Sequence, residues 1–450
     1  MRIILFQFVL FLGAGLLCGV PNNAAAQGAP QASRRLVPVH LPDAKGKFGY
    51  VDKLGNVVVQ PQFDRALEFS EGLGAVQVGG KWGKWGFIDE TGRMVIQPRF
   101  HEVQPFADGM AMILTEDQET SRGRGPLYGF INRKGEVAVA PQYLAARDFG
   151  GGMTFVCLNQ PVTPNHREAD WRLIDRSGHS PCTHEFHLAG FFHEGLAVMA
   201  APVENQEFKF GYIDPTSKVV IAPKFTWARP FCEDRAFVYL GGRYLGEKEG
   251  LEGGKWACID RTGKVLFDKT PSGPWISPKG EYGPSVYHEG LALVQTKKRW
   301  IYLDRDGKTA LGLKADRAHA FSEGLAAIQR KGQWDFIDKT GKTVIGPLQF
   351  KAVGDFSDGL AWFRIERKTD WKFPDGTPMG MEYPKGFIDK SGRVVIPPQY
   401  FEVTDFRDGI ALVSDHEQGY AINHEGKRLG FVNRIDVVKF RLSEFSRRKN

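Results

Sequence analysis

The chain is poor in the residues and segments that most often mark a function. Its 450 residues include 5 Cys and 8 Met. No apolar run after residue 20 reaches the 18 residues of a membrane-spanning helix, so we expect no membrane span in the mature chain. Apolar residues show no helical periodicity, which excludes helical folds. The 59 Lys plus Arg and 52 Asp plus Glu are interspersed, which argues against a nucleic-acid partner.

The N-terminus has the pattern of a secretory signal peptide. Arg2 precedes an apolar run, Ile3–Val20, and three alanines end at Ala26. A positive start, an apolar core and an Ala-x-Ala site are typical of a cleaved export signal. We therefore predict a signal peptide over 1–26, a flexible leader over 27–46, and a periplasmic or extracellular location.

Two other interpretations of the N-terminus remain open. A lipoprotein signal would use Cys18, but Leu17 stands where a small residue is expected. A retained anchor helix is the other, although the run is short for a full span. At the opposite end, residues 434–450 form a basic tail, which we interpret as solvated.

A repeated pattern fills the rest of the chain. The segment Phe321–Ala326 reads Phe-Ser-Glu-Gly-Leu-Ala, and an aromatic-Ile-Asp-x-x-Gly turn and a short aliphatic run follow it. We count about ten copies of a roughly 34 to 40 residue unit over 47–433, which indicates a repeat architecture. The turn position is occupied by Asp52, Asp89, Asn132, Asp175, Asp214, Asp260, Asp304, Asp338, Asp389 and Asn423.

One copy predicts three strands joined by tight turns. The expected strands are Leu325–Gln329, Trp334–Asp338 and Lys342–Ile345, and Pro347 is expected to end the pairing. Asp at the first turn position can accept a hydrogen bond from the backbone two residues on, and Gly at the fourth can adopt positive φ. Each unit is therefore predicted to be a three-stranded antiparallel meander.

The first strand of each unit predicts that the units stack. Leu291–Val294 is apolar on both faces, and a strand of this kind is covered on both sides. Neighbouring units must then share one core. We expect the recurring glycine of the second strand to let the next sheet approach, at Gly86, Gly129, Gly211 and Gly386.

The segment Lys81–Asp89, Lys-Trp-Gly-Lys-Trp-Gly-Phe-Ile-Asp, resembles the repeat of bacterial WG-repeat (KWG-repeat) proteins. The resemblance covers roughly Phe48–Val432, essentially all of the mature chain, although Arg172, Ala257 and Asp335 replace the Gly that follows Trp. It implies a β-rich scaffold, usually taken to be an interaction module, with no shared catalytic residues and no cofactor.

The fold class is therefore all-β, and two arrangements of the units remain open. Propeller rings typically hold about 4 to 8 blades, and ten copies exceed that number. The unequal insertions between copies also work against closure. We favour an open superhelical β-repeat array, with a β-propeller-like closed ring as the alternative.

Cysteine spacing allows several pairings. Cys157, Cys182, Cys232 and Cys258 permit three connectivities, and sequence alone cannot select one. The spacing favours two local bridges, Cys157 with Cys182 and Cys232 with Cys258. Four free buried thiols are the alternative, because no Cys recurs at an equivalent repeat position.

The chain contains one weak candidate for a metal site. Cys182, His184, His187 and His193 lie close together in sequence, and zinc sites use such mixed ligands. Against this, His193 replaces the Ser of the Phe-Ser-Glu-Gly pattern, and His288 occupies the same position. We therefore expect no metal.

Insertions between the repeats are the better candidates for binding. In repeat proteins such insertions often form the binding face. Several aromatic residues lie in them outside the repeat pattern, and they would contact a sugar or a peptide unless they pack back onto the units. These are Trp275, Tyr282, Trp371, Phe373 and Tyr383.

No catalytic motif accompanies the repeats. The chain lacks Gly-x-Ser-x-Gly, His-Glu-x-x-His and a phosphate-binding Gly-rich loop. Carboxylates that recur in every copy belong to the scaffold by default, because a glycosidase needs one pair. We therefore predict an exported, non-enzymatic scaffold that binds a protein or a cell-envelope glycan. The alternative is an envelope enzyme with an unrecognised carboxylate site.

Overall fold

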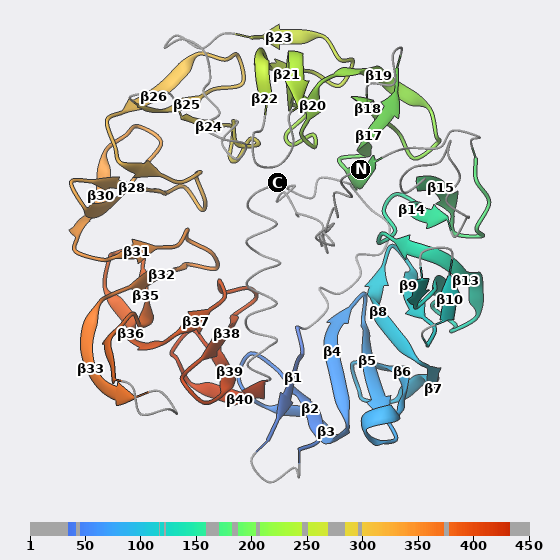
Figure 1. The fold of residues 1–450 in the computed structure, drawn as a ribbon. Coiled ribbons are helices and arrows are strands. Elements are labelled where there is room, and N and C mark those ends of the chain that lie inside the picture. Colours follow the sequence, from blue (N-terminus) through green and yellow to red (C-terminus); the bar gives the residue numbers. More distant parts are fainter. Residues whose placement is uncertain are drawn as a thin grey trace, which may run out of the picture.

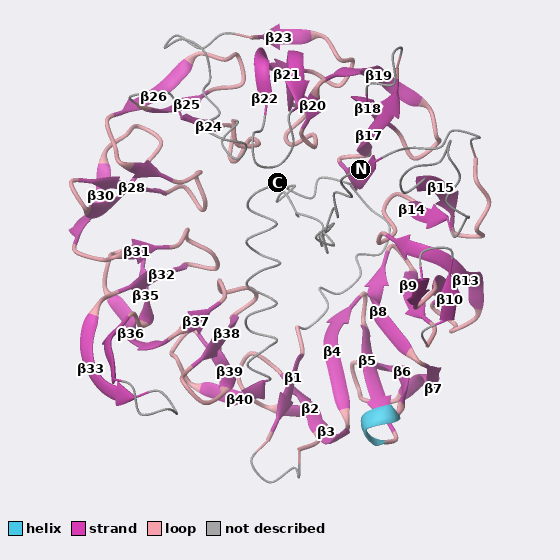
Figure 2. Ribbon diagram, viewed as in Figure 1, coloured by secondary structure: helices cyan, strands magenta, loops and turns pink. Residues whose placement is uncertain are grey.

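The computed structural model describes residues 35–432, apart from 42–45, 117, 121–122, 159–170, 182–187, 204–207, 245–250, 269–283, 296–298 and 373–377. Within these residues the fold is a sequence of antiparallel strands with one 3-10 turn, η1 (Gly80–Trp82) (Figure 2). The all-β prediction is confirmed.

The described strands form ten units. We number the units in chain order and call the strands of a complete unit a, b, c and d. The first five units contain β1 (Val37–His40), β2 (Phe48–Val51) and β3 (Val57–Phe63); β4 (Arg65–Ser70), β5 (Leu73–Val78), β6 (Lys84–Asp89) and β7 (Met94–Phe100); β8 (Glu102–Ala107), β9 (Met110–Leu114), β10 (Gln118–Thr120), β11 (Gly123–Gly125), β12 (Tyr128–Asn132) and β13 (Val137–Ala146); β14 (Met153–Leu158) and β15 (Trp171–Asp175); and β16 (Leu188–His193), β17 (Leu196–Pro202), β18 (Phe208–Ile213) and β19 (Val219–Phe225).

The other five units repeat this order with insertions at different places. They contain β20 (Trp227–Ala228), β21 (Ala236–Tyr244), β22 (Leu251–Ile259) and β23 (Val265–Phe267); β24 (Ala292–Gln295), β25 (Trp300–Leu303) and β26 (Thr309–Leu313); β27 (Arg317–Ala318), β28 (Ala326–Arg330), β29 (Gln333–Ile337) and β30 (Thr343–Leu348); β31 (Ala352–Val353), β32 (Leu360–Arg364), β33 (Arg367–Lys372), β34 (Pro378–Glu382), β35 (Lys385–Asp389) and β36 (Val394–Tyr400); and β37 (Glu402–Val403), β38 (Ile410–Ser414), β39 (Gly419–Asn423) and β40 (Arg428–Val432).

A complete unit has one strand more than the sequence indicated. In unit 8 the expected meander is present as β28, β29 and β30, and the two-residue β27 precedes it as strand a. Strand a pairs with strand b at Arg317↔Gln329 and Ala318↔Ile328. The expectation that Pro347 ends the pairing is wrong, because β30 continues past it and Leu348 pairs with Trp334.

The units form a closed ring (Figure 1). Strand β1 of unit 1 and strand β40 of unit 10 belong to one sheet and pair at His40↔Phe431. Val37 and Val39 of unit 1 share a buried cluster with Leu412 and Leu429 of unit 10. Of the two arrangements left open by the sequence, the structure has the ring rather than the open superhelical array that we favoured.

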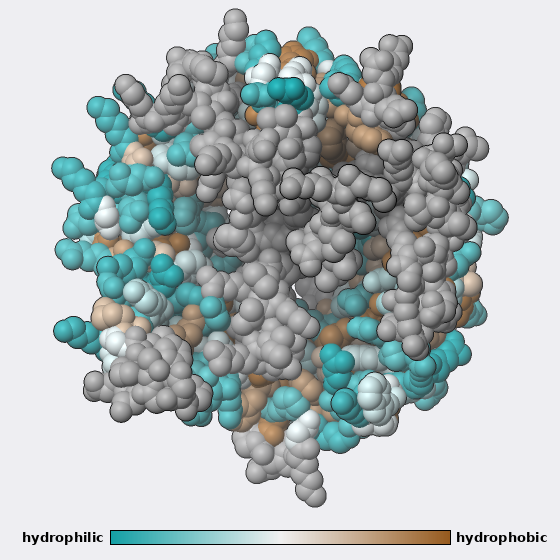
Figure 3. Space-filling view, in the orientation of Figure 1, coloured by the Kyte–Doolittle hydropathy of each residue, from teal (hydrophilic) through white to brown (hydrophobic). Residues whose placement is uncertain are grey.

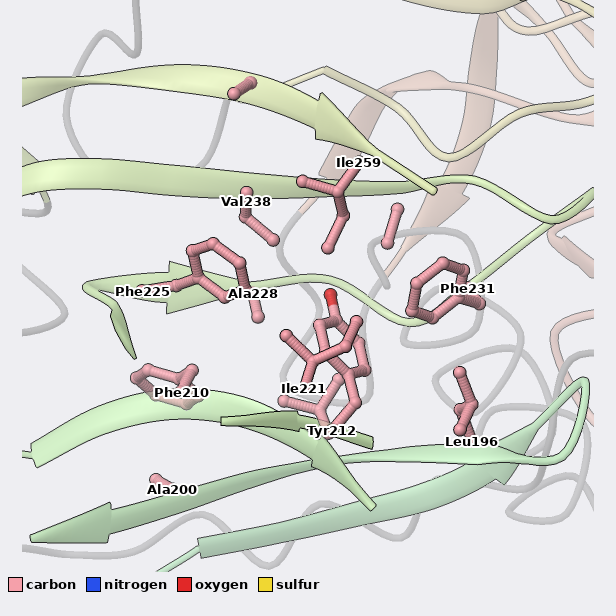
Figure 4. Close-up of a cluster of buried hydrophobic side chains, with 13 residues drawn as sticks. Leu196, Ala200, Phe210, Tyr212, Ile221, Phe225, Ala228, Phe231, Val238 and Ile259 are labelled. Atoms are coloured by element: carbon pink, nitrogen blue, oxygen red, sulfur yellow. The ribbon is translucent and has the colours of Figure 1, made fainter. Parts of the chain in front are cut away.

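The hydrophobic core lies between neighbouring units, as the apolar strands predicted. Figure 4 shows the cluster that joins units 5 and 6, in which Tyr212 and Ile221 of one unit face Phe231 and Val238 of the next. The aromatic residue of strand c packs edge to face on the Phe that precedes the next turn, with ring centroids 4.9 Å apart for Phe336 and Phe356. This contact recurs around the ring, as in Tyr50–Phe69, Phe87–Phe106, Phe130–Phe149, Tyr212–Phe231, Tyr302–Phe321 and Phe387–Phe406.

The glycine that follows Trp has a different role from the one expected. It faces a β-bulge in strand d of its own unit and not the next sheet. A Cβ on Gly86 would lie 2.4 Å from the Ile96 carbonyl oxygen and 2.8 Å from the Pro98 nitrogen. Gly129, Gly211 and Gly386 meet the equivalent backbone atoms of their own units. The strand therefore needs glycine because a bulged strand crosses it at close range.

Two units without this glycine place a glycine on the opposite strand. Ile301 pairs with Gly312 of β26. Asp335 lies beside Gly346 of β30, where an added Cβ would come 2.4 Å from the Asp335 Oδ1. In unit 8 strand d thus supplies the residue without a side chain at the close approach. In unit 7 a Cβ on Gly312 would meet only Thr309 Cγ2, at 3.7 Å.

Candidate functional site

Because the strands are antiparallel, the a–b and c–d turns lie at one end of each unit, and the b–c connection lies at the other. We call these the turn end and the hairpin end. The repeated carboxylates lie at the turn end. The insertions β10–β11 and β33–β34 lie between strands b and c, at the hairpin end.

The Asp of each c–d turn binds its own backbone. Asp89 Oδ1 accepts hydrogen bonds from the amides of Thr91 at 2.9 Å and Arg93 at 3.1 Å, and Gly92 has φ 86°. This confirms the predicted turn mechanism. The Thr91 side chain and these amides hold the pKa of the Asp89 carboxyl below its ordinary value. These bonds give Asp89 Oδ1 a structural role in its own turn.

The carboxylate of each a–b turn binds the next unit. Glu323 of unit 8 accepts a hydrogen bond from the Gly359 amide of unit 9 at 3.1 Å, and its carboxylate lies 3.1 Å from Lys390 Nζ of that unit. The same contacts join Glu71 to Gly109 and Arg133, Asp108 to Gly152 and Arg176, and Glu289 to Gly324 and Lys339. These acidic residues have positive φ, as for Glu323 at 51°. We call this contact the inter-unit clasp.

The clasp is missing between units 4 and 5. Unit 4 has Gly151, with φ 62°, where units 2, 3 and 5 to 10 carry the acidic residue. Unit 5 has Pro215 where the basic residue is expected, and a Cβ on Gly151 would lie 3.1 Å from the Pro215 Cγ. Both members of the pair are therefore absent at the same junction.

A hollow of about 510 Å³ opens at the turn end of units 2 to 4. Its charged walls are already paired, since Arg176 Nη2 lies 2.6 Å from Asp108 Oδ1 and the Gly109 amide lies 3.0 Å from Glu71 Oε2. Both carboxylates are therefore held by groups of the next unit. The hollow is lined by Glu71, Asp108, Gly109, Met110, Asn132, Ala138, Arg176 and Ser177.

At the hairpin end of unit 2, η1 presents an aromatic side chain. Trp82 is 79% exposed, and Lys81 Nζ lies 5.1 Å from the centre of its ring. The turn is ordered by Asp64, whose Oδ2 accepts hydrogen bonds from the amides of Gly79 and Gly80 at 2.9 and 2.8 Å. The sequence did not single out Trp82, because it lies inside the repeat motif; the buried tryptophan of that motif is Trp85.

The hairpin end of unit 9 carries β33 and β34, and Figure 1 shows β33 on the outer edge of the ring. Tyr383 follows this hairpin and is 43% exposed. Its hydroxyl donates to Glu366 Oε1 at 3.4 Å, and the Arg364 guanidinium lies 5.8 Å from its ring centre. Trp371 lies in β33, and its side chain is outside the described residues, as are Phe373, Trp275 and Tyr282.

The surface in this view shows no single large apolar face. Hydrophilic residues predominate around the periphery in Figure 3, with apolar residues in small groups between them. Exposed aliphatic residues recur just after the c–d turns, on strand d. They include Val57, Val95, Val137, Val265, Val344 and Val394.

The repeat of this chain matches a known family. The family described as "WG containing repeat" matches residues 48–82, 85–117, 128–160, 210–244, 302–334, 336–368 and 386–416. The chain belongs to the WG-repeat family. No curated protein matches this WG-repeat chain.

Solved structures with a similar β arrangement are distant from this WG-repeat protein. The β-propeller domain of the Trilobed protease from Pyrococcus furiosus has 11% identity and a TM-score of 0.33, over 73% of this chain and 96% of that chain. Apo AztD from Citrobacter koseri has 12% identity and a TM-score of 0.27, over 69% and 93%. The tricorn protease has 13% identity and a TM-score of 0.22, over 80% of this chain and 38% of that chain.

The predicted cysteine pairs are wrong. Cys157 and Cys258 are buried thiols outside any disulfide, each on a strand of the core. Burial raises the pKa of the Cys258 thiol to about 12. Cys232 is disulfide-bonded.

The weak metal candidates are largely outside the described residues. Cys182, His184 and His187 lie there, and His193 is the last residue of β16, before Glu194 of the clasp. The described part of the chain contains no group of three or more His, Cys, Asp or Glu residues placed to hold a metal ion. No helix in that part has the length and hydrophobicity needed to cross a bilayer.

Proposed function

We propose that this WG-repeat chain is an exported, non-enzymatic scaffold that binds a cell-envelope glycan or a protein with its hairpin ends. One observation carries the proposal. The repeated carboxylates are bonded inside the ring, whereas aromatic side chains stand exposed at the hairpin ends of units 2 and 9. Residues that are engaged in the scaffold leave recognition to those that vary between units.

The exposed aromatic residues suit a polar ligand with an apolar face. A tryptophan ring with a cation beside it, as at Trp82 and Lys81, offers stacking to a sugar ring or a peptide. Tyr383 with Arg364 repeats the combination on unit 9. The hydrogen bonds from Gly79 and Gly80 to Asp64 already fix the backbone of η1. Less conformational entropy is therefore lost when a ligand immobilises Trp82.

The test is cosedimentation of the purified chain, residues 27–450, with isolated cell-wall sacculi. We expect the double substitution Trp82→Ala and Tyr383→Ala to reduce the bound fraction several-fold while the circular dichroism spectrum stays unchanged. Leu54→Ala is the matched control, because Leu54 is 62% exposed but lies in a c–d turn. Equal loss of binding in the control would reject the hairpin ends as the binding surface.

The same incubation distinguishes a non-enzymatic scaffold from the alternative, an envelope enzyme. Supernatants are assayed for released muropeptides and reducing ends. Protein-dependent release of muropeptides or reducing ends would overturn the non-enzymatic proposal. The carboxylates that line the hollow would then be the candidate catalytic residues. Export is tested separately by N-terminal sequencing of the processed chain, for which we expect Gln27 as the first residue.

A further inference from the structure

The hairpin end of unit 2 carries two cations, each beside a tryptophan ring. Lys81 Nζ lies 5.1 Å from the centre of the Trp82 ring, and the Arg65 guanidinium lies 5.4 Å from the centre of the Trp85 ring. Arg65 and Lys81 are both exposed. Within the part of the chain that the structure describes, neither side chain has an ion pair or a hydrogen bond. Both charges therefore remain open to a ligand.

The two cations flank the same turn, η1, which lies between β5 and β6 (Figure 2). Asp64 Oδ2, in the residue before Arg65, accepts hydrogen bonds from two amides of this turn at 2.9 and 2.8 Å. Gln77 pairs with Arg65 on one side and with Trp85 on the other, and its Nε2 donates to the Gly83 carbonyl at 2.9 Å. The start of β4 and both ends of η1 are thus joined in one hydrogen-bonded group.

The two carboxylates that form ion pairs at this end of the unit leave the stacked cations uncompensated. Asp64 pairs with Lys47, besides its bonds to the turn. Glu116 Oε1 lies 3.5 Å from Lys84 Nζ and 3.5 Å from His101 Nδ1. Each carboxylate is thus matched by a cation other than the two that stack on tryptophan, and those two give the surface around η1 an excess of positive charge.

We propose that this surface binds an acidic glycan, a polymer whose sugars carry carboxylates. This ligand class rests on the proposed function of the hairpin ends. The exposed Trp82 ring offers an apolar face to the C–H face of a sugar. The Arg65 guanidinium uses its flat face on Trp85, so its N–H edge is left for bidentate contact with a carboxylate. Lys81 adds a second cation beside the stacked sugar.

This combination is not a general feature of the repeat. At the place of Arg65 on strand a, unit 3 has Glu102 and unit 10 has Glu402. Unit 8 has Arg317 at that place, but its b–c turn, Lys331–Gly332, carries no tryptophan. Unit 2 therefore differs from these units by the exposed ring together with the cations. Arg317 supplies a matched control, since it is exposed on the same strand of another unit.

Calorimetric titration of the purified chain with two oligosaccharides tests the proposal. One is an oligogalacturonate of fixed length, and the other is the same oligomer with its carboxyl groups reduced to hydroxyls. We expect the acidic oligomer to bind about tenfold more tightly, because hydrogen bonds to charged groups are the stronger ones. Added salt should weaken binding of the acidic oligomer and leave that of the reduced oligomer unchanged, because exposed charges are screened.

The variants assign the preference to the two cations. Arg65→Gln with Lys81→Gln should remove the preference for the acidic oligomer, whereas Arg317→Gln should keep it. Trp82→Ala should weaken binding of both oligomers several-fold, because stacking does not depend on the carboxylate. Unchanged melting temperatures would show that all the variants are folded.

Three results would overturn the proposal. Equal affinity for the two oligomers, or a preference that survives the loss of both cations, would reject the acidic glycan and leave the proposed function standing. Binding of neither oligomer would also reject it, and the sacculus assay would then decide the proposed function separately. Tighter binding of poly-glutamate than of the acidic oligomer would reject the glycan in favour of an acidic protein segment.

Discussion

The glycine of the WG motif gives the sharpest prediction, and Gly86→Ala tests it. A Cβ at this position would lie 2.4 Å from the Ile96 carbonyl oxygen, 2.8 Å from the Pro98 nitrogen and 3.0 Å from the Gln97 carbonyl carbon. All three are backbone atoms, so no side chain can rotate out of the way. Strands β6 and β7 must separate by several tenths of an ångström along the bulge.

The cost follows from two opposing effects. Overpacking of a tight contact typically destabilises by about 1–3 kcal/mol, and here backbone has to move, which favours the upper part of that range. Replacing Gly with Ala also reduces the entropy of the unfolded chain, which returns about 0.4–1 kcal/mol. We therefore expect a net loss of about 1–2 kcal/mol in the free energy of unfolding.

Urea unfolding followed by tryptophan fluorescence measures this loss. Gly125→Ala is the matched control, because Gly125 also lies in a strand and a Cβ added there would have no atom within 4 Å. We expect the control to match the unchanged chain within about 0.5 kcal/mol. If Gly86→Ala and Gly125→Ala have the same urea midpoint, the bulge is not the reason for the glycine.

Three further predictions concern the core, the turns and the missing clasp. Phe336→Ala should cost about 3–5 kcal/mol, and limited proteolysis should then cut units 7 to 9 first; simultaneous cleavage throughout the ring would contradict local packing. Asp389→Asn should reduce the loss of stability at acid pH. Hydrogen bonds from the Ser391 side chain and amide lower the pKa of Asp389 from 3.8 to about 2. The Asp389 carboxylate therefore stabilises the fold fully above pH 3.8, and this stabilisation is lost as the pH falls toward 2. Urea midpoints between pH 2 and 5 measure this, and parallel curves for the two chains would refute it. Gly151→Glu with Pro215→Lys should rebuild the absent clasp, with a favourable coupling of about 0.5–1 kcal/mol in a double-mutant cycle; zero coupling at low salt would show that the clasp contributes nothing.

Local features of the fold were predictable from the sequence because their causes are local. The Asp-x-x-Gly turns, the three longer strands and the shared core follow from residues that lie within one copy. The position of Asp338, for example, predicts the hydrogen bonds it accepts from the amides of Thr340 and Lys342. Repetition of the pattern then gave the number of units.

Other features depend on contacts that no single copy contains. Strand a has two residues in unit 8, too few for an alternating pattern, so it gave no signal. Ring closure depends on the pairing of β1 with β40, which lie at opposite ends of the described chain. The bulge opposite Gly86 has no sequence signal apart from Pro98, and the equivalent proline of unit 8, Pro347, predicted a strand end instead.

Of the two exposed aromatic residues proposed to bind, the sequence identified one and missed the other. Tyr383 was identified because it lies outside the repeat pattern, and it is exposed. Trp82 was missed because Lys81–Gly83 repeats the letters of Lys84–Gly86, although only the second copy enters a core strand. The exposed fractions, 79% for Trp82 and 3% for Trp85, separate two tryptophans that sequence alone presents as equivalent.

The Phe-Ser-Glu-Gly pattern explains why recognition should fall to residues outside the repeat. Phe356 packs on the aromatic residue of the unit before it. Ser322 donates a hydrogen bond to the Phe356 carbonyl of the unit after it at 2.7 Å, and Glu323 binds the amide of Gly359 in that same unit. Each position is thus fixed by a neighbouring unit, and a change made for a ligand would weaken a junction of the ring. At the hairpin end, Trp82 contacts Lys81, and Tyr383 contacts Arg364 and Glu366, all of them residues of the same unit. Such residues can vary between units without loss of closure, and that freedom is what a binding surface on a repeat scaffold requires.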